Sequence, residues 1–514
     1  MTALARSAFV HRAVIAGAVL TSLFSGVHLA SAQGGGWSNP VPLSSAATTS
    51  WFPDVAADLS GTVHVVWSSG VTFGFADSYD TVMYTNRQQG SDWSTPLDIV
   101  ALPSKGAVTR PTLLADPSGV LDMTFRSYMV YYSSAPAQSV ATSTLLSPRP
   151  ISSGDNGYFS RVVRDGQDHL HLVYTEYAQT SDCPDCLHVY YRASNDGGLS
   201  WSYPQDISRI SNGAAKPQIV VDGKQVLHVV WEAGRGGDLG QLSDPTTVMY
   251  SASDDGGKSW RVPIQLDAAG TQARNVAIGL TGKDQLVVAW LGLPQDIVYY
   301  QTSSDQGLSW TSAQPIAGLT GGWGVYQSRT DGYAMTTDSA GVVHLLAVGR
   351  TTPGQASLSV LHVAWDGLEW SAPEEIVTLS GDVPEWPRAA VGLGNRLHVV
   401  WFVRDQAHIW GGDGLFRYRV WYAEKDLDAP SATPVVWPTL TPTSSGPVQP
   451  SDAMPTPLPW VQGPSPTIQV AGASDSVVVP ADSENQALLV IVTALSPVFL
   501  LLVGVMVVAY RRRR

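Results

Sequence analysis

Cysteine and positive charge are both scarce in this chain. Its 514 residues include only two cysteines, which excludes a small fold held together by a disulfide framework. Lysine and arginine total 30 against 43 aspartate and glutamate residues, and the formal net charge is -13. An acidic surface repels a phosphate backbone, so we expect no nucleic acid among the partners.

Uncharged apolar runs near the two ends predict an export signal and a membrane anchor. Residues 1–32 combine basic residues, an apolar stretch at 13–23 and small residues before the expected cleavage site, which is typical of a signal peptide. Residues 487–509 carry no charge and precede the basic tail 510–514. A helix of this length spans the ~30 Å hydrocarbon layer, and the arginines mark its inner side. A buried core helix is the alternative, but we expect a single-pass type I protein of the cell membrane with most of the chain outside.

The segment before the anchor has no lysine or arginine and is rich in proline, serine and threonine. It covers residues 429–485. Such a composition cannot bury enough apolar surface to fold, and it favours semi-extended conformations. We therefore expect a disordered stalk that carries the folded ectodomain, residues 33–428.

The two cysteines, Cys183 and Cys186, lie close together in the sequence CPDC. In an exported protein such thiols usually end oxidised, so a disulfide that staples one loop is expected. A metal site with His188 would lack further obvious ligands, and a redox motif would lack its βαβ setting.

Internal repetition dominates the middle of the chain. A short β-branched strand, as in VHVVW and LHVVW, recurs seven times at intervals of 49 to 59 residues. Each repeat is too small to enclose a core alone, and this period is typical of β-propeller blades. The seven copies end at Trp67, Phe125, Tyr174, Trp231, Trp290, Ala347 and Trp401.

Each repeat predicts four strands. An Asp-containing turn precedes the recurring strand, so the first two strands form a hairpin; a third strand follows, and a fourth begins at a tryptophan. The seventh repeat lacks this fourth strand, but a matching segment begins at Trp37. We expect an all-β propeller of seven four-stranded blades, closed by the N-terminal strand. Because the second repeat is degenerate, six blades are the alternative.

A ten-residue motif occurs three times, as RASNDGGLSW, SASDDGGKSW and QTSSDQGLSW. In such a turn an Asp can accept amide hydrogen bonds, Gly tolerates positive φ, and Trp can pack into the blade. The pattern Ser-x-Asp-x-Gly-x-x-Trp resembles the Asp-box, or BNR repeat, of the sialidase-like β-propeller superfamily. The matching residues are Ser194, Asp196, Gly198, Trp201, Ser253, Asp255, Gly257, Trp260, Ser303, Asp305, Gly307 and Trp310.

The resemblance implies that these boxes are structural and lie on the face opposite the substrate pocket. A calcium site at the boxes would need a later glutamate, as in an EF-hand loop, and they lack it. We expect neither a metal nor a cofactor.

The opposite face is where we expect a ligand to bind. Basic residues recur at or near the predicted starts of the innermost strands, where they could bind a carboxylate or pair with neighbouring aspartates. Tryptophans in the same loops could stack on sugar rings, contact a protein, or fill the contacts between blades. The basic residues are Arg110, Arg161, Lys216, Arg274 and Arg388, and the tryptophans are Trp51, Trp323 and Trp386.

Three functions are compatible with this sequence. The first is recognition of a glycan or an extracellular protein at the mouth of the propeller. The second follows from the resemblance: an exo-sialidase or another glycoside hydrolase, or a lyase, acting on acidic glycans. The family's Arg-Ile-Pro motif is not matched here, no tyrosine nucleophile is identified, and Glu176 and Glu232 are the only candidate acid or base residues. The third is a structural surface protein.

Overall fold

The structure, a computed structural model, describes eleven stretches of the chain: residues 36–70, 80–100, 108–140, 148–154, 157–178, 186–209, 213–234, 246–267, 272–322, 331–405 and 418–437. All of them belong to the unit Met1–Thr441, and the second unit is Pro442–Arg514. In these stretches every helix or strand that is assigned is a β-strand, and no helix capable of crossing a membrane is found among them. The predicted signal peptide 1–32, the span 487–509 and the tail 510–514 lie outside the described residues.

The strands form five four-stranded antiparallel sheets and one eight-stranded sheet, which divides into two further units of four strands. We call these seven four-stranded units blades. Blade 1 contains β2 (Thr49–Ala57), β3 (Val63–Gly70), β4 (Thr81–Arg87) and β5 (Leu97–Asp98), and blade 2 contains β6 (Thr109–Ala115), β7 (Val120–Ser127), β8 (Met129–Pro136) and β9 (Arg149–Pro150). Blade 3 contains β10 (Gly157–Arg164), β11 (Leu170–Ala178), β12 (Cys186–Ser194) and β13 (Gln205–Asp206), and blade 4 contains β14 (Ala214–Val221), β15 (Leu227–Ala233), β16 (Thr247–Ser253) and β17 (Ile264–Gln265). Blade 5 contains β18 (Gln272–Leu280), β19 (Leu286–Leu293), β20 (Ile297–Ser303) and β21 (Gln314–Gly321), and blade 6 contains β22 (Ala334–Thr337), β23 (Val343–Arg350), β24 (Leu358–Trp365) and β25 (Glu374–Leu379). Blade 7 contains β26 (Val383–Gly392), β27 (Arg396–Arg404), β28 (Tyr418–Asp426) and, as its outer strand, β1 (Val41–Pro42).

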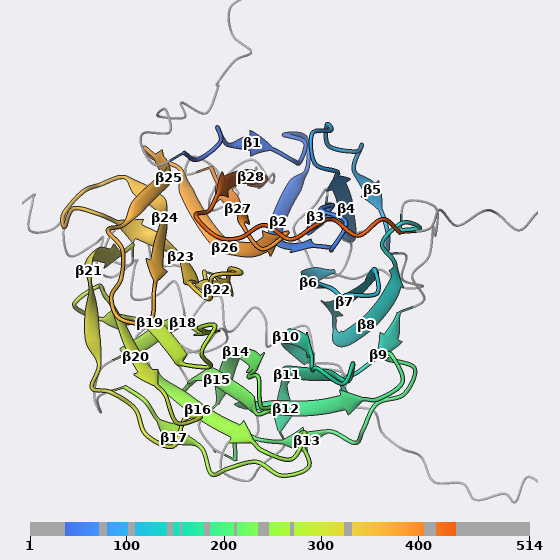
Figure 1. Ribbon diagram of the computed structural model, residues 1–514, viewed down its shortest axis with the longest axis vertical. Helices are drawn as coiled ribbons and strands as arrows, with labels where there is room; N and C mark the ends of the chain where they lie inside the picture. Colours follow the sequence, from blue (N-terminus) through green and yellow to red (C-terminus); the bar gives the residue numbers. More distant parts are fainter. Residues whose placement is uncertain are drawn as a thin grey trace, which may run out of the picture. The chain divides into compact units, whose positions relative to one another are not determined.

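The blades follow one another around a ring (Figure 1). Each innermost strand contacts the innermost strand of the next blade, from β2 through β6, β10, β14, β18, β22 and β26 and back to β2. Blades 5 and 6 are additionally joined through β21 and β23, which pair at Thr320 with Arg350. The arrangement is that of a β-propeller, in which the strand edges that remain are short and protected.

The predicted closure by the N-terminal strand is present. Val41 pairs with Tyr422 and Pro42 with Trp421 on β28, and an isolated bridge joins Trp37 to Lys425. The first strand of the described chain therefore completes the last blade.

The hydrophobic core lies between neighbouring blades. Second strands are buried on both faces, so each contributes apolar residues to the contacts with the blades before and after it. Four tryptophans within the second strands are among the largest fully buried side chains: Trp67, Trp231, Trp290 and Trp401. Burying a ring of this size removes roughly 150 to 250 Å² from water, which makes it a major part of the packing energy.

Each of the three Ser-x-Asp-x-Gly-x-x-Trp motifs, for which we use the name Asp-box for the sequence pattern alone, is a closed hydrogen-bonded turn. In the box of blade 4, the Ser253 hydroxyl donates to Asp255 at 2.8 Å and accepts the amide of Gly257 at 2.8 Å. Asp255 also accepts the Ser259 amide at 2.9 Å and the Ser259 hydroxyl at 2.5 Å. The hydrogen bond from that hydroxyl, opposed by slight burial, lowers the pKa of Asp255 to about 2. The boxes around Asp196 and Asp305 repeat these contacts.

The box tryptophan does not start the fourth strand, contrary to the prediction. The fourth strands are short, and in blades 3 and 4 they begin four residues later, at Gln205 and Ile264. Trp260 instead packs edge-on against Tyr191 of the preceding blade, with ring centroids 5.0 Å apart. Trp201 and Trp310 make the same contact with Tyr132 and Tyr250. The box therefore fastens one blade to the one before it.

Candidate functional site

Six of the innermost strands share a β-bulge with a residue in the left-handed region. Their φ values lie between +45° and +56°, and each bulge interrupts the pairing with the second strand. A side chain in this conformation costs about 1–2 kcal/mol, so surrounding contacts must hold it. Bulges redirect side chains. The residues are Phe52, Arg110, Phe159, Lys216, Asn275 and Trp386.

The bulges bring cationic side chains from different blades to one place. Arg110, Arg161, Lys216 and Arg388 line a single narrow pocket, together with Phe159 and Trp386 among others. The innermost strands of five blades contribute to its lining, together with Gly332, which precedes β22. The pocket therefore lies at the centre of the ring, and we call it the central pocket. Its volume of about 10 Å³ has room for roughly one water-sized group.

Aromatic rings cover the faces of two guanidinium groups. The guanidinium carbon of Arg110 lies 4.6 Å from the ring centre of Phe52 and 4.7 Å from that of Phe159. Arg388 lies 3.8 Å over Trp386. Because the rings cover the faces of each guanidinium, its N–H groups can form hydrogen bonds in the plane of the group.

Arg388 is buried without a paired carboxylate among the described residues. Its Nη1 atom donates to the carbonyl groups of Pro387 at 2.7 Å and Gly332 at 3.2 Å, and its Nε atom has no hydrogen-bond partner in the same part of the chain. Burial lowers the pKa of Arg388 well below its ordinary value. A buried cation in this state gains strongly from a nearby negative charge.

Carboxylates partly balance the other cations. Arg161 pairs with Asp54 at 2.9 Å, and Lys216 lies 3.5 Å from Glu232 and donates to the Asp331 carbonyl at 2.8 Å. Burial raises the pKa of Asp331, which favours its neutral form. Four basic side chains, Arg110, Arg161, Lys216 and Arg388, thus lie beside three carboxyl groups, those of Asp54, Glu232 and Asp331.

The remaining predicted site residues lie elsewhere. Arg274 is buried on β18 and does not line the central pocket. Glu176 accepts hydrogen bonds from the Ser153 hydroxyl and amide, so it holds the connection between β9 and β10. Trp51 packs against Phe52 and Tyr418 at 4.8 and 5.9 Å. Trp323 lies outside the described residues.

Glu232 is close to the central pocket without lining it. Its Oε1 atom accepts the amide of Asn275 at 2.6 Å, and its buried Oε2 atom has no partner among the described residues. This carboxylate thus supports the bulge of blade 5 and faces Lys216.

Cys186 is disulfide-bonded, and Cys183, the other cysteine of the chain, lies outside the described residues. His188 is held by Asp206 through an Nδ1 contact of 2.6 Å. Within the described stretches there is no group of three or more metal-ligating side chains.

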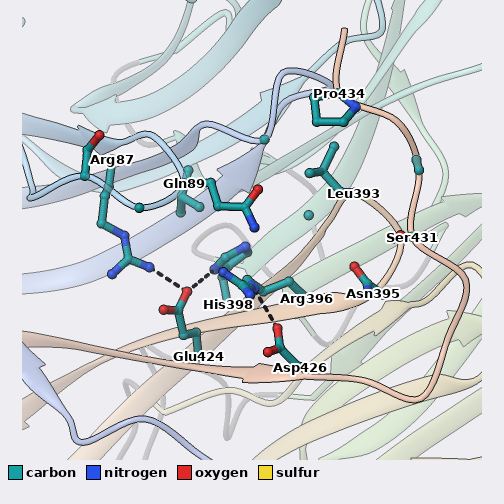
Figure 2. Close-up of a pocket in the computed structure, with 16 residues that line it drawn as sticks. Arg87, Gln89, Leu393, Asn395, Arg396, His398, Glu424, Asp426, Ser431 and Pro434 are labelled. Carbon is teal, nitrogen blue, oxygen red and sulfur yellow. Dashed lines mark hydrogen bonds and ion pairs between the residues drawn. The ribbon is translucent and has the colours of Figure 1, made fainter.

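A second pocket lies at the seam between blades 1 and 7, where the ring closes. We call it the seam pocket; it measures about 650 Å³, within the usual size of small-molecule sites. Figure 2 shows Arg87 beside Glu424, and Arg396 beside Asp426 and His398. Sequence reasoning missed this pocket, because it depends on how the first and last blades meet.

The end of the described chain forms one wall of the seam pocket. Residues 427–437, which we call the strap, run across the turns between first and second strands instead of leaving the ring at β28. Amides of the strap donate to carbonyls in blades 7 and 1, Ala432 to Leu393 and Val435 to Leu59, both at 2.7 Å. Farther along, the indole of Trp437 packs against Gly119 of blade 2. It lies so close that a Cβ atom added at Gly119 would be 3.0 Å from the indole. Part of the segment assigned to the stalk therefore packs on the propeller.

No family model matches the sequence, and no curated protein is similar to it. Solved structures with a similar arrangement include a lectin of Burkholderia pseudomallei, at 15% identity and a TM-score of 0.48, covering 76% of this chain and 99% of the lectin. A protein of unknown function from Dyadobacter fermentans is 14% identical with a TM-score of 0.47, covering 76% of this chain and 99% of that chain. NanB sialidase of Streptococcus pneumoniae is 12% identical with a TM-score of 0.44, covering 79% of this chain and 71% of that chain. Likenesses this distant assign no activity to the chain.

Proposed function

We propose that the chain is a glycan-binding propeller whose central pocket receives the carboxylate of an acidic sugar. The observation that carries the proposal is the convergence of Arg110, Lys216 and Arg388 on one space, with Arg161 beside them. Guanidinium groups bind carboxylates through two parallel hydrogen bonds.

The size of the pocket selects the group that enters it. A volume of about 10 Å³ admits one water-sized group, such as a single carboxylate oxygen, but no sugar ring. The ring of the sugar would remain above, toward the loops that join the blades. Phe159 and Trp386 exclude water beside the cations, which strengthens their attraction to the carboxylate.

Binding, rather than bond cleavage, is the simpler role for this site. Hydrolysis of a glycosidic bond generally uses two acid or base groups beside that bond. The one observation in favour of a glycoside hydrolase or lyase is the Oε2 atom of Glu232, which has no partner among the described residues. A glycoside hydrolase or lyase is therefore the second candidate function. If no sugar binds, the alternative ligand is an extracellular protein.

Calorimetry with the purified full chain tests the proposal. Glucuronic acid and N-acetylneuraminic acid are titrated, with glucose as the uncharged control. We expect both acids to bind and Arg110→Gln to weaken them about ten- to a hundredfold, the range for losing a charged hydrogen bond. Arg261→Gln removes a charge at the Asp254 pair instead and should leave binding unchanged.

Two outcomes would redirect the assignment. Glucose binding as tightly as the acids would contradict carboxylate recognition. Turnover of a fluorogenic sialoside that Glu232→Gln abolishes would establish the enzyme instead.

We also propose that the propeller is presented outside the cell on the predicted helix 487–509. The uncharged run and the basic tail after it support this orientation. Protease treatment of intact cells should release propeller fragments, whereas a cytoplasmic propeller would be protected.

A further inference from the structure

A histidine near the start of the second strand recurs with an aspartate six residues before it. In four blades the imidazole Nε2 atom lies 3.2 to 3.4 Å from that carboxylate. The Nδ1 atom contacts a tyrosine hydroxyl or another histidine on the third strand. Both ring nitrogens are thus satisfied. The four pairs are His64 with Asp58, His171 with Asp165, His228 with Asp222, and His344 with Asp338.

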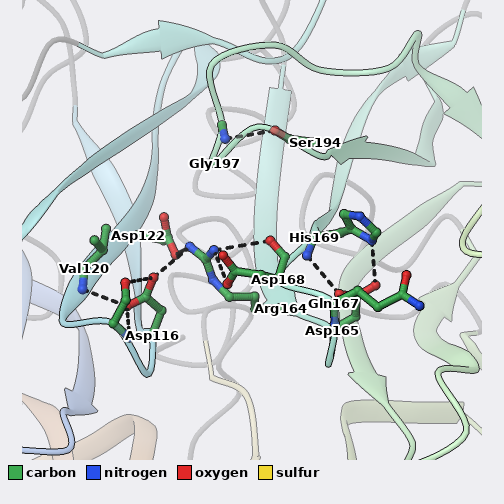
Figure 3. A network of polar contacts seen from close by, with 12 residues as sticks. Asp116, Val120, Asp122, Arg164, Asp165, Gln167, Asp168, His169, Ser194 and Gly197 are labelled. Carbon is green, nitrogen blue, oxygen red and sulfur yellow. Dashed lines mark hydrogen bonds and ion pairs between the residues drawn. The ribbon is translucent and has the colours of Figure 1, made fainter.

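Blade 2 shows that the carboxylate at this position is compensated even without a histidine. Asp122 takes the place of the histidine, six residues after Asp116. Arg164 of blade 3 bridges both carboxylates, at 2.5 Å from Asp122 and 3.3 Å from Asp116 (Figure 3). The aspartate at this position is therefore held by a histidine in four blades and by an arginine in blade 2.

Blade 7 has the histidine without the aspartate. His398 keeps the Nδ1 contact, at 2.6 Å from the Tyr422 hydroxyl, but the residue six positions earlier is Gly392. His398 is only 3% exposed. No hydrogen bond to its Nε2 atom is made within the described part of the chain, where the four other histidines each meet a carboxylate.

The seam pocket borders the imidazole of His398. His398 and Gly392 both line it, and a Cβ on Gly392 would lie 2.8 Å from Nε2. Glycine is therefore what keeps the approach to the nitrogen clear. Arg396 lines the same pocket and is bound at Nε by Asp426 at 2.7 Å.

We infer that the seam pocket binds a small organic acid, whose carboxylate accepts a hydrogen bond from His398 Nε2 and lies beside Arg396. The carboxylate of the ligand would occupy the position beside Nε2 that an aspartate of the chain occupies in four other blades. The pocket, at about 650 Å³, accommodates an acid as large as a sugar acid. This site is separate from the central pocket and does not depend on it.

The neighbouring groups place the proton of the neutral imidazole on Nδ1, so Nε2 donates only when the ring carries a second proton. Burial lowers the pKa of His398, so this second proton needs a negative charge beside Nε2. Tyr422 has one hydroxyl hydrogen, and Glu424 lies 2.8 Å from that hydroxyl. When Tyr422 donates to Glu424, Nδ1 must donate to Tyr422, and a carboxylate at Nε2 favours a second proton on the ring. The charged groups around the ring are Glu424, Arg87, Arg396 and Asp426.

Nitrogen-15 NMR of the histidine-labelled full chain tests the site. Acetate and glucuronate are titrated, with glucose as a control of sugar size without a carboxylate. We expect both acids to shift the Nε2 resonance of one histidine, identified by its loss in His398→Gln. Glucuronate should bind at least tenfold more tightly than acetate, because the pocket can contact the whole molecule.

Variants separate this site from the others. Gly392→Ala places a methyl group against Nε2 and should abolish the shift while His398 remains present. His228→Gln changes a histidine that already has its own aspartate and should leave the titration unchanged. Arg110→Gln weakens only the central pocket, so a histidine shift lost in that variant would overturn the inference. The inference also fails if no histidine resonance responds to acetate, or if glucose produces the same shift.

Discussion

Trp260 of blade 4 and Tyr191 of blade 3 pack edge to face, with centroids 5.0 Å apart. The Tyr191 hydroxyl also lies 3.2 Å from the carbonyl of Gly256 in the same box, and its other contact is His171 at 2.7 Å. An Asp-box is thus part of an interface between blades, and its residues are best tested as contacts across that interface.

Two adjacent glycines of this box should differ sharply in their tolerance of alanine. Both have positive φ, +73° at Gly256 and +85° at Gly257. A Cβ at Gly256 meets nothing within 4 Å, whereas at Gly257 it would lie 2.0 Å from the Tyr191 hydroxyl oxygen. We expect Gly256→Ala to cost about 1–2 kcal/mol of unfolding free energy and Gly257→Ala about 1–3 kcal/mol more. Equal melting temperatures for the two variants would contradict the interface role.

The Asp-boxes should make the protein less stable in strong acid. Serine hydroxyl and amide hydrogen bonds lower the pKa of Asp196 and Asp305 to about 2, as they do at Asp255. Because the folded pKa lies below the unfolded one, this stability is present above about pH 4 and is lost as the pH falls toward 2. The triple Asp→Asn variant should show a smaller drop in melting temperature between pH 4 and pH 2. An unchanged drop would mean that other carboxylates cause it.

The buried histidines should destabilise the fold at a milder pH. Burial, and then the charge of His362, lower the pKa of His344 to about 4. As the pH falls from about 6.5 to 4, the unfolded chain takes up a proton that the folded chain resists, so stability declines. His344→Gln should reduce the difference in melting temperature between pH 7 and pH 5. An unchanged difference in that variant would contradict the role of His344.

The strap should contribute measurably to ring stability. Trp437 lies against Gly119, whereas its neighbour Val436 is 90% exposed. We expect Trp437→Ala to lower the melting temperature by a few degrees and to speed proteolysis of the strap, because it loses packing that Val436→Ala leaves in place. Similar behaviour of the two variants would show that the strap is held by its backbone alone.

The architecture could be predicted from the sequence because each blade carries the same markers. The recurring strand, the Asp turn and the missing last strand together located the closure between 37 and 426. Counting from strand ends placed the starts of the innermost strands at Arg110, Lys216 and Trp386. The strands begin one to three residues earlier, and these three residues have positive φ at the bulges instead. A following proline, as at Pro111, Pro217 and Pro387, was a local marker of the bulge that sequence reasoning did not use.

The sites were harder to predict, because they depend on contacts between blades. Arg274 has the right spacing but does not reach the central pocket, since spacing within one blade does not fix where a long side chain ends. Asp331, which joins Lys216, Asn275 and the Trp386 amide, belongs to no repeated motif. Gly392 could have been found, because alignment of the repeats places it where four blades have the aspartate that meets a histidine.

The strap also determines how a pulling force would reach the propeller. A load on the chain beyond Trp437 acts first on the indole at Gly119, then on the Val435 hydrogen bond, and only then on that of Ala432. These contacts would open one at a time, and the released strap of residues 427–437 can extend to a total length of at most about 36 Å at roughly 3.3 Å per residue. The strap would therefore detach and extend before the force acted on β28, the strand that pairs with β1 to close the ring.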